Sequence, residues 1–256
     1  MRLQSENKVE INDRVIGGST PLVCLPLVAK GKSELLEQAR ELEVLFPDLL
    51  EWRIDAYDAV EDVDACLAAL TALKAEIDRI PLIFTCRIHT EGGFNNIAEQ
   101  DRLKLITAAI ESGGVDIVDI ELCNPSVFIE TVKQAAVRND AKLILSYHNF
   151  DETPDEPFIL EKLVKAQEMG ADIAKLAAMP KNYEDVLTLL SATLKARSGA
   201  VKTPIVTMSM GEIGGLTRLA GGLFGSDITF AVGQKSSAPG QIPIGKLKQA
   251  MAVLYE

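Results

Sequence analysis

Short apolar runs alternate with longer amphipathic, charged segments along most of the chain. The runs span four to seven residues and are apolar on both sides, which is typical of strands buried on both faces of a parallel sheet. They predict strands over residues 22–28, 49–54, 82–88, 115–121, 142–147, 173–176, 205–208 and 228–232. The segments between them predict helices over residues 33–45, 60–78, 97–112, 125–138, 155–169, 182–196, 216–224 and 244–254.

Eight strands, each followed by a helix, predict an α/β fold of the (β/α)8 TIM-barrel type, for which 256 residues is a usual length. A doubly wound open sheet is the alternative, but it normally stops at five or six strands. No Pro- or Ser-rich linker divides the chain, so we expect residues 1–256 to form a single barrel domain. Residues 1–20 do not follow the alternation. Val9, Ile11 and Val15, separated by Asn12-Asp13, predict a short N-terminal hairpin extension that closes the barrel floor.

Composition excludes several classes of partner. The chain has 26 Lys plus Arg against 37 Asp plus Glu, a net charge of −11, so neither nucleic acid nor a membrane is an expected partner. Four cysteines lie far apart and only two histidines are present, which leaves few ligands for a zinc site. The N-terminus has no apolar run, and no apolar stretch approaches the ~20 residues of a membrane span. We therefore expect a cytoplasmic protein.

Functional side chains of such barrels lie at the C-terminal ends of strands. Lys175 lies in an apolar strand, and burial in apolar surroundings lowers the pKa of a lysine amine and frees it as a nucleophile towards a carbonyl group. The alternative is a lysine at the strand edge whose amine reaches solvent. Polar residues at the ends of the other predicted strands favour the catalytic interpretation.

His148 also follows a predicted strand, and a near-neutral pKa suits it to move protons in both directions. A structural histidine is the other interpretation. His89 lies in a predicted loop, and we interpret it as an exposed loop residue.

Three arginines could clamp an anionic, hydroxyl-rich ligand through their planar donor groups. These are Arg53, Arg87 and Arg218. Glu51 and Glu91 could accept hydrogen bonds or orient a base. A structural ion-pair network is the alternative, and both roles can hold together.

The loop over residues 233–241 is rich in small residues and polar at its tip, so it is predicted to be a lid over the site. Gly92-Gly93 and Gly221-Gly222 lack the spacing of known phosphate-binding loops, so they are weak evidence for a phosphate site.

Taken together, the motifs resemble the type I 3-dehydroquinate dehydratase family, in register from about Pro21 to the C-terminus. The strings that carry the resemblance are Glu51-Trp52-Arg53-Ile54-Asp55, Thr85-Cys86-Arg87, Glu91-Gly92-Gly93, Ser146-Tyr147-His148-Asn149-Phe150, Thr153-Pro154, Lys175-Leu176-Ala177-Ala178-Met179-Pro180, Met208-Ser209-Met210-Gly211, Arg218, Phe224-Gly225-Ser226 and Ser237-Ala238-Pro239-Gly240-Gln241.

The resemblance implies dehydration of 3-dehydroquinate to 3-dehydroshikimate, the third step of the shikimate pathway towards chorismate and the aromatic amino acids. It implies that Lys175 condenses with the C3 ketone to form a Schiff base, which acidifies the C2 hydrogen. His148 then takes that proton and later returns one to the departing C1 hydroxyl, while Glu91 orients the imidazole. No metal or organic cofactor is expected, and a homodimer is implied.

The resemblance also implies the residues that bind the substrate. Arg218 corresponds to the arginine that grips the substrate carboxylate, helped by Gln241 and Ser237 from the predicted lid. Glu51, Arg53 and Arg87 correspond to residues that bind the ring hydroxyls.

Two other functions remain as alternatives. A different imine-forming barrel enzyme, such as a class I aldolase, is expected to have a phosphate site after strands seven and eight, where this sequence has a lid with serine and glutamine. A catalytically silent ligand-binding module is disfavoured because the lysine, the histidine and the orienting glutamate are all present.

Overall fold

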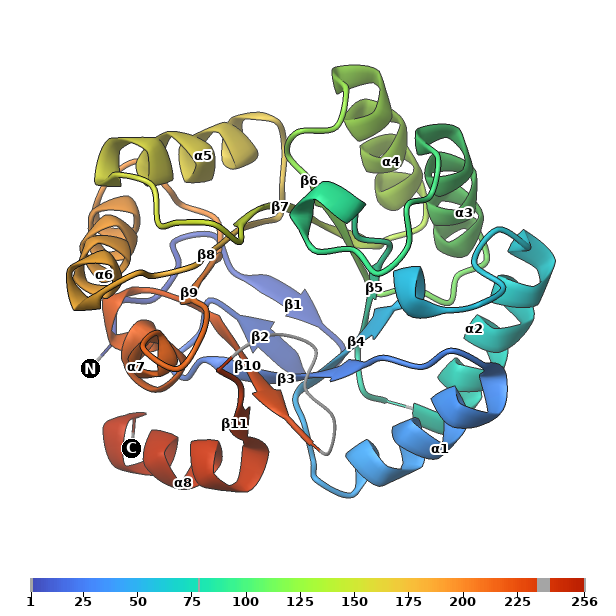
Figure 1. The fold of residues 1–256 in the computed structure, drawn as a ribbon, viewed down its shortest axis with the longest axis horizontal. Helices are drawn as coiled ribbons and strands as arrows, with labels where there is room; N and C mark the ends of the chain where they lie inside the picture. The colour runs from blue at the N-terminus through green and yellow to red at the C-terminus, as the bar shows by residue number, and fades with distance from the viewer. Residues whose placement is uncertain (1, 78, 234–239, 256) are drawn as a thin grey trace.

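The computed structural model describes residues 2–77, 79–233 and 240–255. Parallel strands curl into a barrel, and helices surround it (Figure 1). The barrel strands are β3 (Leu22–Leu27), β4 (Leu49–Arg53), β5 (Leu82–Thr85), β6 (Ile117–Glu121), β7 (Lys142–Asn149), β8 (Ile173–Ala178), β9 (Ile205–Ser209) and β10 (Ile228–Val232). The helices are α1 (Lys32–Glu43), α2 (Val63–Ile77), α3 (Glu99–Glu111), α4 (Ser126–Arg138), α5 (Glu156–Glu168), α6 (Tyr183–Ser198), α7 (Gly215–Ala220) and α8 (Ile244–Tyr255).

The predicted (β/α)8 barrel is confirmed. Neighbouring strands pair in the order β10, β3, β4, β5, β6, β7, β8, β9. The seam between β9 and β10 is joined by a parallel bridge between Ile205 and Ser226, and the Asp227 amide donates to the Ile205 carbonyl at 2.6 Å. All eight predicted strands are present, which excludes the open-sheet alternative.

The observed elements differ from the predicted ones mainly at their ends. β5 ends at Thr85, so the chain leaves the sheet before Arg87, whereas β7 and β8 each continue two residues beyond the predicted end, to Asn149 and Ala178. A two-residue strand that the sequence did not predict, β11 (Ile242–Pro243), pairs with β10. Such a strand is too short to produce an alternating pattern. The predicted helix over 216–224 divides into α7 and the 3-10 helix η3 (Gly221–Phe224), where two glycines weaken the α-helix.

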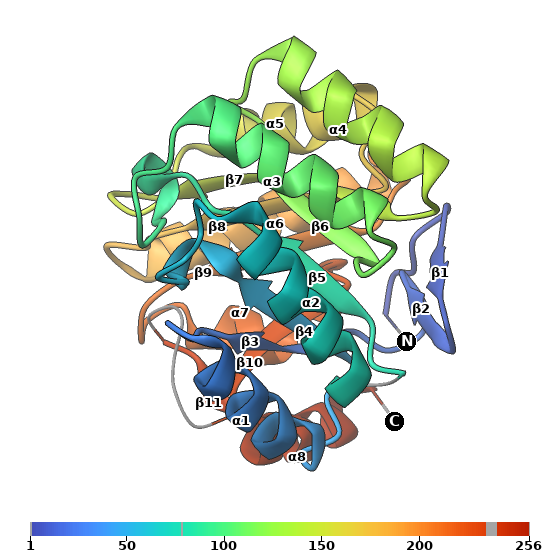
Figure 2. The ribbon, with the colours of Figure 1, turned by 90° about the vertical axis from the view of Figure 1, so that its right-hand side faces the viewer.

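The predicted N-terminal hairpin is confirmed as β1 (Val9–Ile11) and β2 (Arg14–Ile16), an antiparallel pair at one end of the barrel (Figure 2). Val9, Ile11 and Ile16 are buried in one cluster with apolar residues from the beginnings of the barrel strands, such as Leu49 and Ile83. The hairpin therefore closes the floor.

The barrel interior changes character along the five strands β4 to β8. The first inward residues are apolar, which makes the floor a packed core: Leu49, Ile83, Ile117, Ile144 and Ile173. The next inward-facing side chain of each of these strands, two positions further along, is polar. These are Glu51, Thr85, Asp119, Ser146 and Lys175, all buried. Polar chemistry is thus confined to the end of the barrel opposite the hairpin.

Candidate active site

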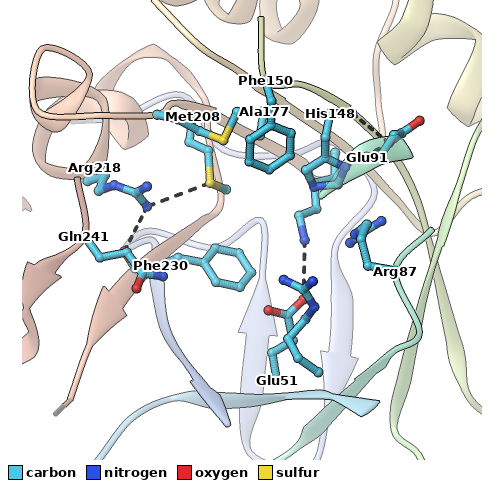
Figure 3. Close-up of a pocket in the computed structure, with 13 residues that line it drawn as sticks. Glu51, Arg87, Glu91, His148, Phe150, Ala177, Met208, Arg218, Phe230 and Gln241 are labelled. Carbon is cyan, nitrogen blue, oxygen red and sulfur yellow. Dashed lines mark hydrogen bonds and ion pairs between the residues drawn. The ribbon is translucent and has the colours of Figure 1, made fainter. Parts of the chain in front are cut away.

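The C-terminal ends of the strands surround a pocket with about 480 Å³ of empty space (Figure 3). One part of its lining is polar and carries most of the predicted site residues: Glu51, Arg53, Arg87, Glu91, His148 and Lys175. Another part is apolar and comes from Phe150, Ala177, Met208, Met210 and Phe230. An apolar lining with a few convergent polar groups is typical of a site for a small molecule.

Lys175 extends from β8 and has only 5% of its surface exposed. Its Nζ lies 2.7 Å from Asp119 Oδ2, 3.6 Å from Glu51 Oε1 and 4.7 Å from the centre of the Phe230 ring. The predicted burial of Lys175 is confirmed, but its amine faces carboxylates as well as an aromatic ring. The sequence around Lys175 is apolar, but β4 and β6 place their carboxylates against its amine. The alternative of a lysine that reaches solvent is also excluded by its burial.

His148 lies in the extended end of β7, and Glu91 reaches it from the 3-10 helix η2 (His89–Glu91). Glu91 Oε2 accepts a hydrogen bond from the His148 backbone amide at 2.8 Å and lies 3.1 Å from Nδ1. With the ring proton on Nδ1, Nε2 keeps its lone pair and can act as a base.

Both groups of this pair have shifted pKa values, and burial is the main cause of each shift. Burial, with the charges of Arg87 and Lys175, lowers the pKa of His148 well below its usual value, so the ring is neutral at neutral pH. Burial raises the pKa of Glu91 to about 7, although Arg87 opposes the shift. His89, in the same short helix, is exposed as predicted.

Arg87 combines the two roles that the sequence left open. It lines the pocket, and it also belongs to a buried ion-pair network with Asp119 at 2.9 Å and Glu121 at 2.8 Å. Burial disfavours its charge, but Asp119 and Glu121 outweigh this effect and raise its pKa. The guanidinium is thus held in place and charged, with the Ser146 hydroxyl accepting a further hydrogen bond from Nη1 at 2.7 Å.

Arg53 also lines the pocket while it is held from behind. Its Nε and Nη2 donate to the two Asp55 oxygens at 2.9 and 2.8 Å, and Nη2 donates to the Gly92 carbonyl at 3.1 Å. The Phe94 ring centre lies 5.0 Å from its guanidinium carbon, a cation–π contact. These bonds join the end of β4 to the loop that carries Glu91.

Arg218 and Gln241 lie across the pocket from Arg87 and Glu91, beside Met208 and Phe230 (Figure 3). Arg218, from α7, is 2% exposed and donates to the Phe230 carbonyl at 3.1 Å. Burial lowers its pKa to about 10, so it stays charged at neutral pH. The predicted lid over 233–241 and its Ser237 fall largely outside the described residues, which resume at Gly240.

Several residues of the site had no role assigned from the sequence, although Asp119, Glu121 and Ser146 stand at the ends of predicted strands. Asp119, Glu121 and Ser146 bind Lys175 or Arg87 directly, and Phe230 faces the amine. A signal for two of them was present, since Asp119 and Glu121 occupy alternate positions of one buried strand and therefore face the same side. Within the described residues, no group of three or more His, Cys, Asp or Glu is arranged to hold a metal ion.

Comparison with known proteins places this site in a family. The family model for type I 3-dehydroquinase matches residues 23–256. The chain belongs to the type I 3-dehydroquinase family. It is therefore a dehydratase, an enzyme of the hydro-lyase class. The 3-dehydroquinate dehydratase of Geobacillus thermodenitrificans is 41% identical over 253 residues, covering 98% of each chain. That of Albidiferax ferrireducens is 43% identical over 254 residues, covering 98% of this chain and 96% of its own.

Solved structures of the family agree with this fold. The 3-dehydroquinate dehydratase from Geobacillus kaustophilus HTA426 superposes with a TM-score of 0.96 at 41% identity, covering 99% of this chain and 98% of its own. The type I enzyme from Clostridium difficile, solved with covalently modified comenic acid, has a TM-score of 0.93 at 37% identity and 97% coverage of both chains. None of the helices in the described ranges has both the length and the apolar character needed to cross a membrane.

Proposed function

We propose that this enzyme converts 3-dehydroquinate to 3-dehydroshikimate and water through a Schiff base on Lys175, and so serves the shikimate pathway. The observation that carries the proposal is a buried lysine amine in the same pocket as a neutral histidine with a carboxylate at its Nδ1. Family membership supports the choice of substrate.

The reaction follows from the properties of these groups. The Lys175 nitrogen replaces the C3 oxygen of the substrate, and the resulting iminium withdraws electrons from C2. His148 Nε2 takes the C2 proton, and the electron pair moves into the iminium to give an enamine. The same imidazolium then gives a proton to the C1 hydroxyl, which leaves as water when the electrons return. Hydrolysis of the imine releases the product. Glu91 stabilises the imidazolium that forms between the two proton transfers.

The polar lining supports a substrate with a carboxylate and several hydroxyl groups. We assign Arg218, with Gln241 and Ser237, to the carboxylate, because this arginine is buried, charged and separated from the carboxylates of the Lys175 side. Glu51, Arg53 and Arg87 are assigned to the ring hydroxyls, since they offer donors and acceptors that are already held in position.

Borohydride trapping tests the proposed imine. We expect reduction in the presence of 3-dehydroquinate to attach the substrate carbon skeleton to Lys175, as peptide mass spectrometry would detect. The exposed Lys181 is the internal control and is expected to stay unmodified. In the variant His148→Ala, trapping should persist while turnover falls by roughly 10²- to 10⁴-fold. An unmodified Lys175 in the wild-type enzyme would contradict the mechanism.

Substitution of Arg218 tests the carboxylate assignment. Arg218→Ala is expected to raise KM for 3-dehydroquinate strongly, because a charge-assisted pair in a buried pocket is lost. Binding of a ring analogue without the carboxylate should change little. Equal losses for both ligands, measured by competition, would assign Arg218 to another part of the substrate.

We further propose, on the family resemblance, that the enzyme is a cytoplasmic homodimer that needs no metal or organic cofactor. Light scattering should then give twice the mass of the chain, and dialysis against a chelator should leave turnover unchanged.

A further inference from the structure

Asp119 is the carboxylate nearest to the amine of Lys175. Its Oδ2 lies 2.7 Å from Nζ, and its side chain has no exposed surface. Glu51 is the second carboxylate near this amine, at 3.6 Å, and its Oε1 also accepts the Thr85 hydroxyl at 2.9 Å. Distance and hydrogen bonding therefore favour Asp119 as the partner that exchanges protons with the amine.

The Asp119 carboxylate is held in one orientation. The Ser146 hydroxyl donates to Oδ1 at 2.6 Å, and Arg87 Nη2 lies 2.9 Å from the same oxygen. Arg87 is in turn bound by Glu121, which receives a further hydrogen bond from Arg102 of α3 at 2.6 Å. Both supporting groups thus bind Oδ1, while Oδ2 points to the lysine.

The protonated form of Lys175 creates a chemical requirement. An ammonium group has no lone pair, so it must lose a proton before it attacks a carbonyl carbon. His148 Nδ1 faces Glu91, and the proposed function already employs Nε2 at C2. We propose that Asp119 is a further catalytic residue, which takes protons from Lys175 and delivers them to the departing oxygen during imine formation. This inference rests on the proposed function.

The protons and charges balance in this step. The first ammonium proton moves to Asp119 Oδ2, and the freed lone pair bonds to C3 as the C–O π electrons move to oxygen. Asp119 passes this proton to the oxygen, takes a second one from nitrogen, and gives that to the hydroxyl, which leaves as water. The nitrogen lone pair then forms the C=N bond. One proton remains on the iminium, and Asp119 is again a carboxylate, so the charge of the pair is the same before and after.

The charges around Asp119 are compatible with this role. Burial alone would raise its pKa, but Arg87 and then Lys175 hold it well below the usual range. The contribution of Lys175 is lost as soon as its own proton has moved. Transfer of a proton from Lys175 to Asp119 is therefore less unfavourable than the low pKa of Asp119, taken alone, would imply.

Two variants of Asp119 test the inference by single-turnover borohydride trapping with saturating 3-dehydroquinate. Asp119→Asn keeps the shape and cannot accept a proton, so trapping should be at least about 100-fold slower. Asp116→Asn, which changes an acid paired with Lys74 outside the pocket, is the matched control and should trap at the wild-type rate. Circular dichroism would check that each variant is folded.

Asp119→Ala distinguishes a catalytic role of the carboxylate from a structural one. Formate can occupy the space of the lost carboxylate, and it should accelerate trapping in Asp119→Ala while leaving the wild-type enzyme unchanged. Trapping by either variant at the wild-type rate, or slow trapping that formate does not accelerate, would overturn the inference. If the wild-type enzyme itself traps no substrate, the proposed function fails first, so the two failures are distinguishable.

Discussion

At the level of single side chains, His148 and Glu91 show how burial can set two ionisations in opposite directions. Burial penalises whichever form is charged, so the pKa of His148 falls well below its usual value and that of Glu91 rises to about 7. In the neutral range it is therefore Glu91, and not the imidazole, that changes its charge. The carboxylate form is the stronger acceptor for Nδ1–H and makes Nε2 more basic.

We predict an acidic limb of kcat/KM near pH 7 that belongs to Glu91. As pH falls through this value, Glu91 gains a proton and loses its negative charge. It then stabilises the imidazolium of His148 less, so kcat/KM falls. Glu91→Gln should lower kcat by roughly 10²-fold and remove the limb, because no ionising group remains there. Rate profiles from pH 5.5 to pH 8 check this, and a limb retained in the variant would assign the titration to a different residue.

At the level of elements, the short helix η2 brings Glu91 to β7. The chain turns there through Gly92, whose φ of +84° lies in the left-handed region that glycine adopts without strain. A Cβ at this position would lie 2.4 Å from the Phe150 ring. The close approach holds the loop after β5 against the loop after β7, which is the contact that Glu91 and His148 need.

Gly92→Ala is therefore expected to lower both stability and turnover. The unfavourable backbone conformation and the clash with Phe150 should together lower the free energy of unfolding by about 1–3 kcal/mol. Gly113→Ala is a matched control, since Gly113 also has a positive φ, +72°, but a Cβ there would have no neighbour within 4 Å. Urea unfolding and kcat measure the two effects. Similar kcat values in both variants would show that the clash does not reach Glu91.

At the level of the whole molecule, Asp227 connects distant segments at the beginning of β10. Its Oδ2 lies 2.5 Å from Arg197 of α6 and accepts the Ile205 amide of β9 at 2.8 Å, while Oδ1 pairs with Arg2. Its backbone carbonyl accepts the Leu22 amide of β3 at 2.9 Å. One buried carboxylate thus joins the N-terminal segment, helix α6 and the β9–β10 seam.

Asp227→Asn should destabilise the barrel by about 3–5 kcal/mol, because two buried arginines lose their counter-charge. Glu76→Gln, which removes the partner of the exposed Arg40, is the control and should change stability little. Urea unfolding followed by circular dichroism and by the fluorescence of Trp52, the single tryptophan, gives both values. If residues 1–256 are one domain, as we propose, the two signals change together. If Asp227→Asn lowers the free energy of unfolding no more than Glu76→Gln does, the role of this carboxylate is contradicted.

The sequence by itself determined the eight strands of the barrel and its helical ring, and it indicated several residues that line the pocket. Local patterning carries this information, since alternate residues of a strand share a face and the ends of parallel strands meet at one end of a barrel. Lys175, His148 and the arginines could be selected for that reason. The positions of strand ends were less certain, as β5 and β7 show, because backbone pairing with neighbours decides where a strand stops.

Only the tertiary structure decided which charges meet. Asp119 and Lys175 are 56 positions apart and come from strands that are separated by β7, yet their side chains touch. The apolar sequence around Lys175 therefore predicted its burial, but not its contact with Asp119. Contact across a barrel depends on the stagger between strands and on the reach of each side chain, and neither is encoded in the pattern of a single segment.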